Sequence, residues 1–432
     1  MKAYILAAIL TTAAATGAGA EVWDLDRCIG YAIEHNISVQ QNALTAHEGE
    51  LSVTEAKDRF LPQLSAYGSQ SFNFGRGLTA DNTYANRNTT STSVGAQLSL
   101  PIFQGLSAIR RLDYSRTALK AMLEQTESVK DDVTLNVITQ YLQALYASEM
   151  LAVARERLAI SNNELTRRRQ LLEAGKIPEL DLYEATAQVS QDELSVVNAQ
   201  NDSILALLDL AQLLNLPSAE GFEIAPLADE RLPLLSPDEV FANAMHTNHA
   251  IRAQQFQAEA AEKNVALAKS GYIPTLSFNA GIGTNYYRTS GFQNEGFGAQ
   301  FRHNFAKSIG FSLSVPIFDA FGTRNSVRRA RAQQESVRLQ FDDTRNRLYK
   351  AITQAYTQAI GAEKKKEAAN RTVESTAAAF EAMKVKYDNG RATPTEFEKA
   401  KADYTNALAE AVQGKYESIL RARILNFYNR GL

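Results

Sequence analysis

Few side chains of this chain are spaced for catalysis or for holding a cofactor. The sequence contains no Walker-type phosphate loop, no HExxH and no G-x-S-x-G, and Gly281-Ile282-Gly283 lacks the rest of a dinucleotide-binding fingerprint. His246 and His249 are spaced so that both rings could share one helical face as metal ligands, but no third ligand is evident nearby. We therefore predict no catalytic residue, no metal site and no cofactor, and we do not expect an enzyme.

Charged side chains offer a second kind of chemistry, namely contact with a partner. The runs Arg167-Arg168-Arg169 and Lys364-Lys365-Lys366 are predicted to be solvated helix faces, and the arginine run lies close enough to a helix end to contact a partner protein. The formal net charge of the whole chain is -3, without a clustered basic excess. Nucleic-acid binding is therefore not expected.

The first 20 residues have the features of a signal peptide. Lys2 precedes an apolar stretch, and Ala18-Gly19-Ala20 is a small-residue cleavage pattern, so residues 1–20 are predicted to be removed during export. Loss of Lys2 would change the net charge from -3 to -4. The only cysteine, Cys28, lies some eight residues beyond the cut rather than at it, so we do not expect a lipid anchor there.

Beyond the signal, no segment offers the 18 or more uninterrupted apolar residues that a transmembrane helix needs. The nearest, residues 204–216, is broken by Asp209, Gln212 and Asn215. Any membrane crossing must therefore use strands.

The chain contains a repeat of about half its length. Four matches are in register, the first two 212 positions apart and the last two 215 apart: Asn36 with Asn248, Leu61-Pro62 with Ile273-Pro274, Pro101-Ile102-Phe103 with Pro316-Ile317-Phe318, and Gly175-Lys176 with Gly390-Arg391. We predict a first repeat over residues 21–216, a linker over 217–237 and a second repeat over 238–432.

Each repeat is predicted to contain one very long helix. Residues 106–174 hold neither Gly nor Pro, and residues 323–389 hold only Gly361, so helix breakers are nearly absent. Such a helix extends roughly 100 Å. Gly175 with Pro178, and Gly390 with Pro394, provide a turn, after which shorter helices over 179–214 and 395–429 run back. Helices near 36–59 and 248–270 have the length to cover the remainder of the long ones.

Between the helices the apolar period changes from 3.6 to 2. Residues 93–102, 276–286 and 308–315 alternate apolar and small polar side chains, and the strand after Pro62 is compatible with this pattern. The alternation fits a transmembrane barrel or a half-buried soluble sheet. Export favours the barrel, and four strands cannot close one, so several copies are needed; three copies would supply twelve strands. Residues 75–92 and 289–307 are the predicted extracellular loops.

Taken together, these features resemble the outer-membrane efflux proteins, the TolC-like family. The resemblance covers nearly the whole mature chain and rests on the repeat, the strand entries at Pro62 and Pro274, the Pro-Ile-Phe exits and the two glycine tips. It implies a homotrimer with a shared twelve-stranded barrel in the outer membrane and a periplasmic α-helical tunnel. It also implies a passive exit duct in a tripartite efflux or type I secretion system, docked to a periplasmic adaptor and an inner-membrane transporter.

The resemblance further implies a periplasmic gate and a docking site. The gate tyrosine falls on Tyr387, the gate aspartate on Asp181 and an acidic constriction position on Glu396, with the Tyr387 hydroxyl expected to donate to the Asp181 carboxylate. The sequence departs from the family at Lys399, where a second acid is expected, and at Ala392, where an arginine is expected. Arg391 is the candidate substitute for that arginine. The adaptor-docking tips fall on four residues, namely Gly175, Lys176, Gly390 and Arg391.

Two alternatives compete with these interpretations. Asp181 and Glu396 are also the acids that a helix start favours through its dipole, without any gate. A secreted, soluble coiled-coil structural or adaptor protein would share the long helices. It would be soluble without detergent, whereas a channel would partition with outer membranes.

Overall fold

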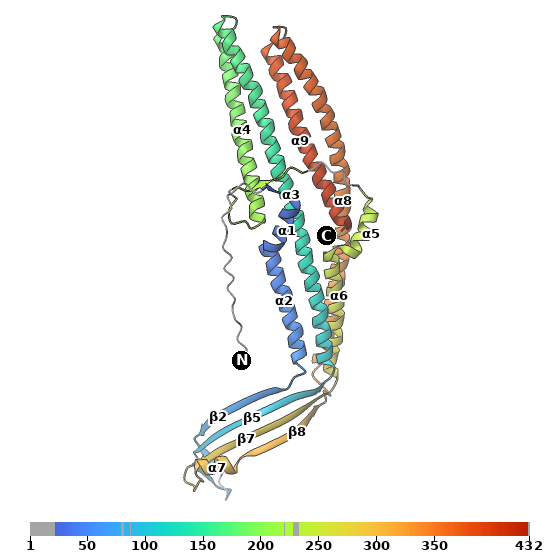
Figure 1. Ribbon diagram of the computed structural model, residues 1–432. Coiled ribbons are helices and arrows are strands. Elements are labelled where there is room, and N and C mark those ends of the chain that lie inside the picture. Colours follow the sequence, from blue (N-terminus) through green and yellow to red (C-terminus); the bar gives the residue numbers. More distant parts are fainter. Residues whose placement is uncertain (1–21, 79–81, 87, 220, 228–232, 431–432) are drawn as a thin grey trace. The chain divides into compact units, whose positions relative to one another are not determined.

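A computed structural model describes residues 22–78, 82–86, 88–219, 221–227 and 233–430 (Figure 1). The predicted signal peptide lies outside the described residues. The chain divides into two compact units. Unit 1 is drawn from Met1–Asn42, Glu127–Asn248 and Asn346–Leu432, and unit 2 from Ala43–Thr126 and His249–Arg345. Each unit therefore takes segments from both predicted repeats.

Two helical hairpins contain the longest helices of the chain, and both hairpin tips belong to unit 1. In the first hairpin α3 (Ser107–Glu173) is followed by α4 (Glu179–Leu213), and in the second α8 (Gly322–Asp388) is followed by α9 (Pro394–Arg430). Both long helices have 67 residues, as the shortage of Gly and Pro predicted. The start of α8 lies 215 positions after the start of α3, and the same offset separates the starts of α4 and α9.

The core of unit 1 forms where the N-terminal segment meets α3 and α4. Helix α1 (Leu25–His35) buries Leu25 and Cys28 in an apolar cluster with Leu142 and Leu210. Burial raises the pKa of the Cys28 thiol to about 12, so this cysteine is an inert core residue in the fold.

A short parallel strand pair borders this core. Strand β1 (Val22–Trp23) pairs with β6 (Glu223–Ile224), which lies in the predicted linker. The hydroxyl of the fully buried Tyr141 lies 2.7 Å from the Ala225 carbonyl and 3.1 Å from the Trp23 carbonyl, so its one hydrogen is shared between two backbone acceptors. Helix α5 (Pro237–Thr247) follows, and its N-terminus has a capping box formed by Ser236 and Glu239.

Unit 2 contains an antiparallel four-stranded sheet in the order β2-β5-β7-β8 (Figure 1). The strands are β2 (Gln63–Asn73), β5 (Thr89–Gln104), β7 (Thr275–Thr289) and β8 (Ala306–Ser314). All four predicted strands are therefore present. Within the described residues β2 and β8 are edge strands, and their apolar side chains are exposed, with Leu64 at 75% and Ile309 at 76%. Helices α2 (Ile37–Asp58) and α6 (His249–Ala268, followed by a 3-10 turn at Lys269–Tyr272) begin directly after Asn36 and Asn248, as expected.

The predicted loops contain short elements that the sequence pattern did not indicate. Strands β3 (Arg76–Leu78) and β4 (Tyr84–Asn86) pair within residues 75–92, and α7 (Phe297–His303) lies within residues 289–307. The Gln300 side chain accepts from the Tyr287 amide at 2.9 Å and donates to the Tyr287 carbonyl at 3.0 Å, which attaches α7 to β7.

No helix in the described part of the chain is both long and apolar enough to cross a membrane. His249 lies 2.8 Å from Glu124, which also pairs with Arg252 at 2.6 Å, so this imidazole belongs to an ion-pair cluster. Among the described residues no group of three or more His, Cys, Asp or Glu side chains is arranged to hold a metal ion.

Candidate functional site

Both hairpin tips end their long helix with the same backbone motif. The Gly175 and Lys176 amides donate to the Leu172 and Leu171 carbonyls at 2.8 and 2.9 Å. At the second tip Gly390 and Arg391 donate to Tyr387 and Lys386 at 3.0 and 2.9 Å. The two glycines have φ of +68° and +67°, which completes a Schellman motif in each case. The four predicted tip residues are all exposed.

The helices that return from the tips begin differently. The Glu396 carboxylate accepts from the Thr393 amide at 2.7 Å, and the Thr393 hydroxyl accepts from the Glu396 amide at 3.3 Å, which is a capping box. The bonds from the Thr393 backbone and hydroxyl lower the pKa of Glu396. Helix α4 has no side-chain cap at Pro178. Glu396 therefore has a local role at its own helix start.

Tyr387 is buried between the two hairpins, and its hydroxyl has a partner within the same chain. The hydroxyl donates to Glu164 Oε1 at 2.5 Å, and the ring stacks on Phe397 with centroids 4.8 Å apart. Burial first, and then the bond to Glu164, raises the pKa of Tyr387 to about 12. A phenol has one hydrogen to donate, so while this bond holds, Tyr387 does not donate to Asp181 as expected.

The arginine run was predicted to be a solvated face, and for two of its three members this was wrong. Arg168 is buried, with Nε 2.8 Å from Glu164 Oε1 and a terminal nitrogen 3.0 Å from the Asp181 carbonyl. The Arg167 guanidinium lies 4.2 Å from the Tyr387 ring centroid and donates to the Tyr387 carbonyl at 2.9 Å. Only Arg169 is exposed. Lys364 and Lys365 are exposed as predicted.

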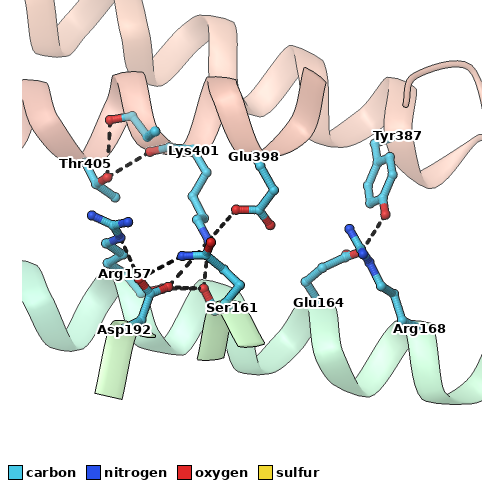
Figure 2. A network of polar contacts seen from close by, with 11 residues as sticks. Arg157, Ser161, Glu164, Arg168, Asp192, Tyr387, Glu398, Lys401 and Thr405 are labelled. Carbon is cyan, nitrogen blue, oxygen red and sulfur yellow. Dashed lines mark hydrogen bonds and ion pairs between the residues drawn. The ribbon is translucent and has the colours of Figure 1, made fainter. Parts of the chain in front are cut away.

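A second polar cluster lies farther from the tips and was not predicted (Figure 2). Asp192 on α4 is fully buried, and it accepts from Ser161 at 2.5 Å and from Gln188 at 3.1 Å. Its carboxylate lies 2.8 Å from Arg157 Nε and 3.5 Å from Lys401 Nζ. Lys401 is 1% exposed, and it donates to Ser161 at 2.7 Å and pairs with Glu398 at 2.7 Å. We call these residues the hairpin cluster: Arg157, Ser161, Asp192, Glu398 and Lys401.

The hairpin cluster balances its own charge. Arg157 and Lys401 supply two positive charges, and Asp192 and Glu398 supply two negative charges. A buried ion is tolerated only when it is paired and hydrogen-bonded, and both buried members meet that condition. Asp192 follows the buried Val189 by three positions and Lys401 follows the buried Phe397 by four, so each charge shares a face with apolar side chains of its own helix.

Comparison with known proteins gives the family. A family model described as outer membrane efflux protein matches residues 28–216 and 240–424. The chain belongs to this family. The outer membrane efflux protein BepC of Brucella suis is 23% identical over 372 residues, which cover 86% of this chain and 77% of BepC. The outer membrane protein TolC of Escherichia coli is 23% identical over 382 residues, which cover 85% of this chain and 74% of TolC.

A solved structure shows the same fold. The CmeC outer membrane channel of Campylobacter jejuni superposes with a TM-score of 0.79 at 15% identity, over 94% of this chain and 85% of the CmeC chain. The family match confirms the predicted resemblance, the outer-membrane location and a channel protein rather than an enzyme. It also decides against the soluble coiled-coil alternative.

Proposed function

We propose that this outer-membrane exit duct works as a homotrimer whose tips dock to a periplasmic adaptor and whose periplasmic end closes as a gate. Membership of the family implies an adaptor and an inner-membrane transporter as partners. The duct itself is a passive conduit, because transport energy comes from the transporter.

The main support for a trimer is the four-stranded sheet of unit 2. Its edge strands β2 and β8 carry exposed apolar side chains, and an unpaired strand edge in lipid leaves backbone groups without partners. Three copies would join β8 of one to β2 of the next and close twelve strands. Detergent-extracted protein is expected to have a trimer's mass by light scattering. A monodisperse monomer with native helicity would contradict the proposal.

The docking proposal rests on the two tips. Both expose a glycine followed by a basic residue, Lys176 or Arg391, at the end of a long helix. Replacing both basic residues by glutamate is expected to reduce crosslinking to the adaptor and export, while the trimer still forms. Replacement of the nearby exposed Lys384 and Lys386 is the matched control. Unchanged adaptor crosslinking with both tips altered would place docking elsewhere.

The proposed gate consists of Tyr387, Asp181 and Glu396. In it, Tyr387 stabilises the closed state through its hydrogen bond to Glu164. The Tyr387–Glu164 bond holds the end of α8 against α3, and a hydrogen bond to a charged group contributes roughly 1.5 to 3 kcal/mol. Tyr387→Phe removes the donor and keeps the ring. We expect larger or more frequent openings in planar bilayers from this variant, because the closed arrangement loses stability.

Two comparisons sharpen the gate test. Tyr387→Phe and Glu164→Gln are expected to be less than additive, because the first removes the hydrogen bond that the second weakens by removing the acceptor's charge. Asp181→Ala is expected to open the channel additively with Tyr387→Phe, since these side chains do not share a bond within the chain. Glu396→Gln should reduce any cation preference of the open pore. If Tyr387→Phe and Asp181→Ala channels conduct like the parent, these residues do not form the gate.

A further inference from the structure

The two edges of the four-stranded sheet are built differently. Strand β2, at one edge, has 11 residues, whereas β8, at the other edge, has 9 and pairs with β7 only from Thr275 to Gly283. Strand β7 has 15 residues and continues to Thr289, with β5 beside it along the whole length. Among the described residues, the end of β7 that is farther from α6 therefore has no strand on its β8 side. We call this part of β7 its outer end.

Side-chain amides take the place of the missing strand. Helix α7 lies at this end of the sheet (Figure 1), and three amides in or beside it bond every second residue of the β7 edge: Asn304 bonds Asn285, Gln300 bonds Tyr287 and Asn294 bonds Thr289. Asn294 and Gln300 each accept from the backbone N–H and donate to the backbone carbonyl of their partner, at 2.8 to 3.0 Å. A carboxamide has the same donor and acceptor as a peptide group, so these side chains satisfy the edge as a strand would. We call residues 294–304 the α7 cap.

Further contacts attach the α7 cap to the outer end of β7. The Thr284 hydroxyl donates to the Phe301 carbonyl at 2.7 Å. The Tyr286 ring lies 5.1 Å from the Phe297 ring, which in turn stacks on Phe301 with centroids 4.7 Å apart. The α7 cap therefore packs on β7 as well as bonding to its edge.

The edge matters because of the joint between copies in the proposed trimer, where β8 of one copy pairs with β2 of the next. No turn connects these two strands, whereas a turn fixes the register of a hairpin. A slip of one residue would move every side chain to the wrong face, but a slip of two residues keeps each side chain on its own face. The alternation of apolar and polar side chains therefore does not choose between registers that differ by two residues.

The α7 cap limits where this joint can extend. An uncovered β7 edge would offer free N–H and carbonyl groups to another strand. A helix is about 10 Å wide, whereas neighbouring strands are about 4.8 Å apart, so α7 takes the space in which β8 would continue and the space of the strand beyond it. We propose that the α7 cap is a register stop, which ends the pairing of a second copy's β2 where β8 begins, at Ala306. This inference rests on the proposed trimer.

Removal of the three amides tests the α7 cap. The triple variant Asn294→Ala, Gln300→Ala and Asn304→Ala frees the backbone groups of the β7 edge. Hydrogen-exchange protection of the two β7 amides that the cap bonds should fall about 10-fold. The trimer should dissociate at a lower temperature in SDS. Gln293→Ala, at an exposed amide of the same loop, is the matched control and should behave like the parent.

Cysteine crosslinking between copies measures the register itself. Ser308→Cys in β8 is combined in turn with a cysteine at Ser69, Ser71 or Asn73, which share one face of β2 and differ by two-residue steps. In the parent, one of the three pairs should form most of the covalent trimer on a denaturing gel. In the triple variant a second pair should link as well, because β2 can slip by two residues. Native Cys28 is fully buried and should not react.

A milder variant keeps the test valid if the triple variant does not fold. Gln300→Glu retains an acceptor for the Tyr287 amide but, when ionised, has no donor for the Tyr287 carbonyl. It should lower the dissociation temperature less than the triple variant does, with helicity unchanged by circular dichroism. If Gln300→Glu and the triple variant both match the parent in dissociation temperature and in the linked pair, the α7 cap is not a register stop.

The outcomes also separate this inference from the trimer proposal. A stable trimer in which none of the three cysteine pairs links would overturn the register stop, because the copies would not be joined through β8 and β2. The trimer proposal would survive that result. A parent protein that is a monodisperse monomer would contradict the trimer itself.

Discussion

The first and second hairpins share a backbone conformation but not a surface chemistry. Both long helices have 67 residues, and both tips have a Schellman motif with a glycine at positive φ. The buried acids Glu164 and Asp192 lie only on the first hairpin, whereas Lys401 and Tyr387 lie only on the second. The two hairpins therefore share the residues that determine the backbone, while the residues at their mutual contact form complementary sets.

The largest expected effect separates the buried faces of the two hairpins. Lys401→Met removes one of the two cations beside the buried Asp192 and leaves it paired with Arg157 alone, so it should lower the free energy of unfolding by roughly 1 to 3 kcal/mol. Thr186 is exposed and lies 215 positions before Lys401, at the same place in the first hairpin. Thr186→Met should change the free energy of unfolding by less than about 0.5 kcal/mol. Chemical unfolding followed by circular dichroism would measure both. The double variant Lys401→Met with Asp192→Leu should recover most of the lost stability, because it removes both buried charges. A double variant as unstable as Lys401→Met would show that the pair contributes to stability beyond neutralising its own charges.

The tips should behave alike, because the same backbone motif ends both long helices. Gly175→Val and Gly390→Val each place a β-branched residue at positive φ, at a cost on the order of 1 kcal/mol or more. We expect similar losses of stability for the two variants, and reduced export with the trimer still assembled. Gly361→Val, inside α8, is the control for a glycine without a positive φ. A large difference between the tips would mean that one is held by contacts beyond its own turn.

The helix starts should differ, because only α9 has a side-chain cap. Thr393→Ala removes a capping hydroxyl and should lower the stability of the α9 start by about 1 kcal/mol. Pro178→Ala, at the corresponding position of α4, removes no cap bond. Hydrogen exchange of the first-turn amides would report each start separately. Equal exchange in both variants would show that the α9 cap contributes little.

The smallest expected effect is on pH dependence. The pKa of Glu396 is lowered in the folded protein, so its contribution to stability is present above its unfolded value of about 4.5 and is lost as the pH falls through the folded value. The protection of the parent's α9 first-turn amides, measured relative to their intrinsic exchange rates, should therefore fall below about pH 4.5, whereas that of Glu396→Gln should change less over that range. The first turn of α4, which lacks this cap, provides the internal reference. A parent profile that matches Glu396→Gln would contradict the cap's role.

Local rules explain how far the sequence could predict the site. The tip turns follow from Gly175 and Gly390, and the Thr393-x-x-Glu396 pattern was a recognisable capping box that would have assigned Glu396 its local partner. Glu164 could not be predicted as the acceptor for Tyr387, because 223 positions separate the two residues and only the packing of α8 on α3 brings them together. Arg168 has its ion-pair partner Glu164 on its own helix, but Glu164 also accepts from Tyr387 of the second hairpin, so the burial of this group depends on the same packing.

By itself, the sequence determined the lengths of the long helices, the tips, the four strands and the repeat, because each depends on neighbouring residues: absent helix breakers, glycines at turns and period-2 alternation. Only the tertiary structure decided which side chains meet. It placed Lys401 beside Asp192 and Tyr387 beside Glu164, and it buried Arg168, which the sequence pattern predicts to be solvated. The physical reason is that burial and pairing depend on contacts between residues hundreds of positions apart, which no local pattern encodes.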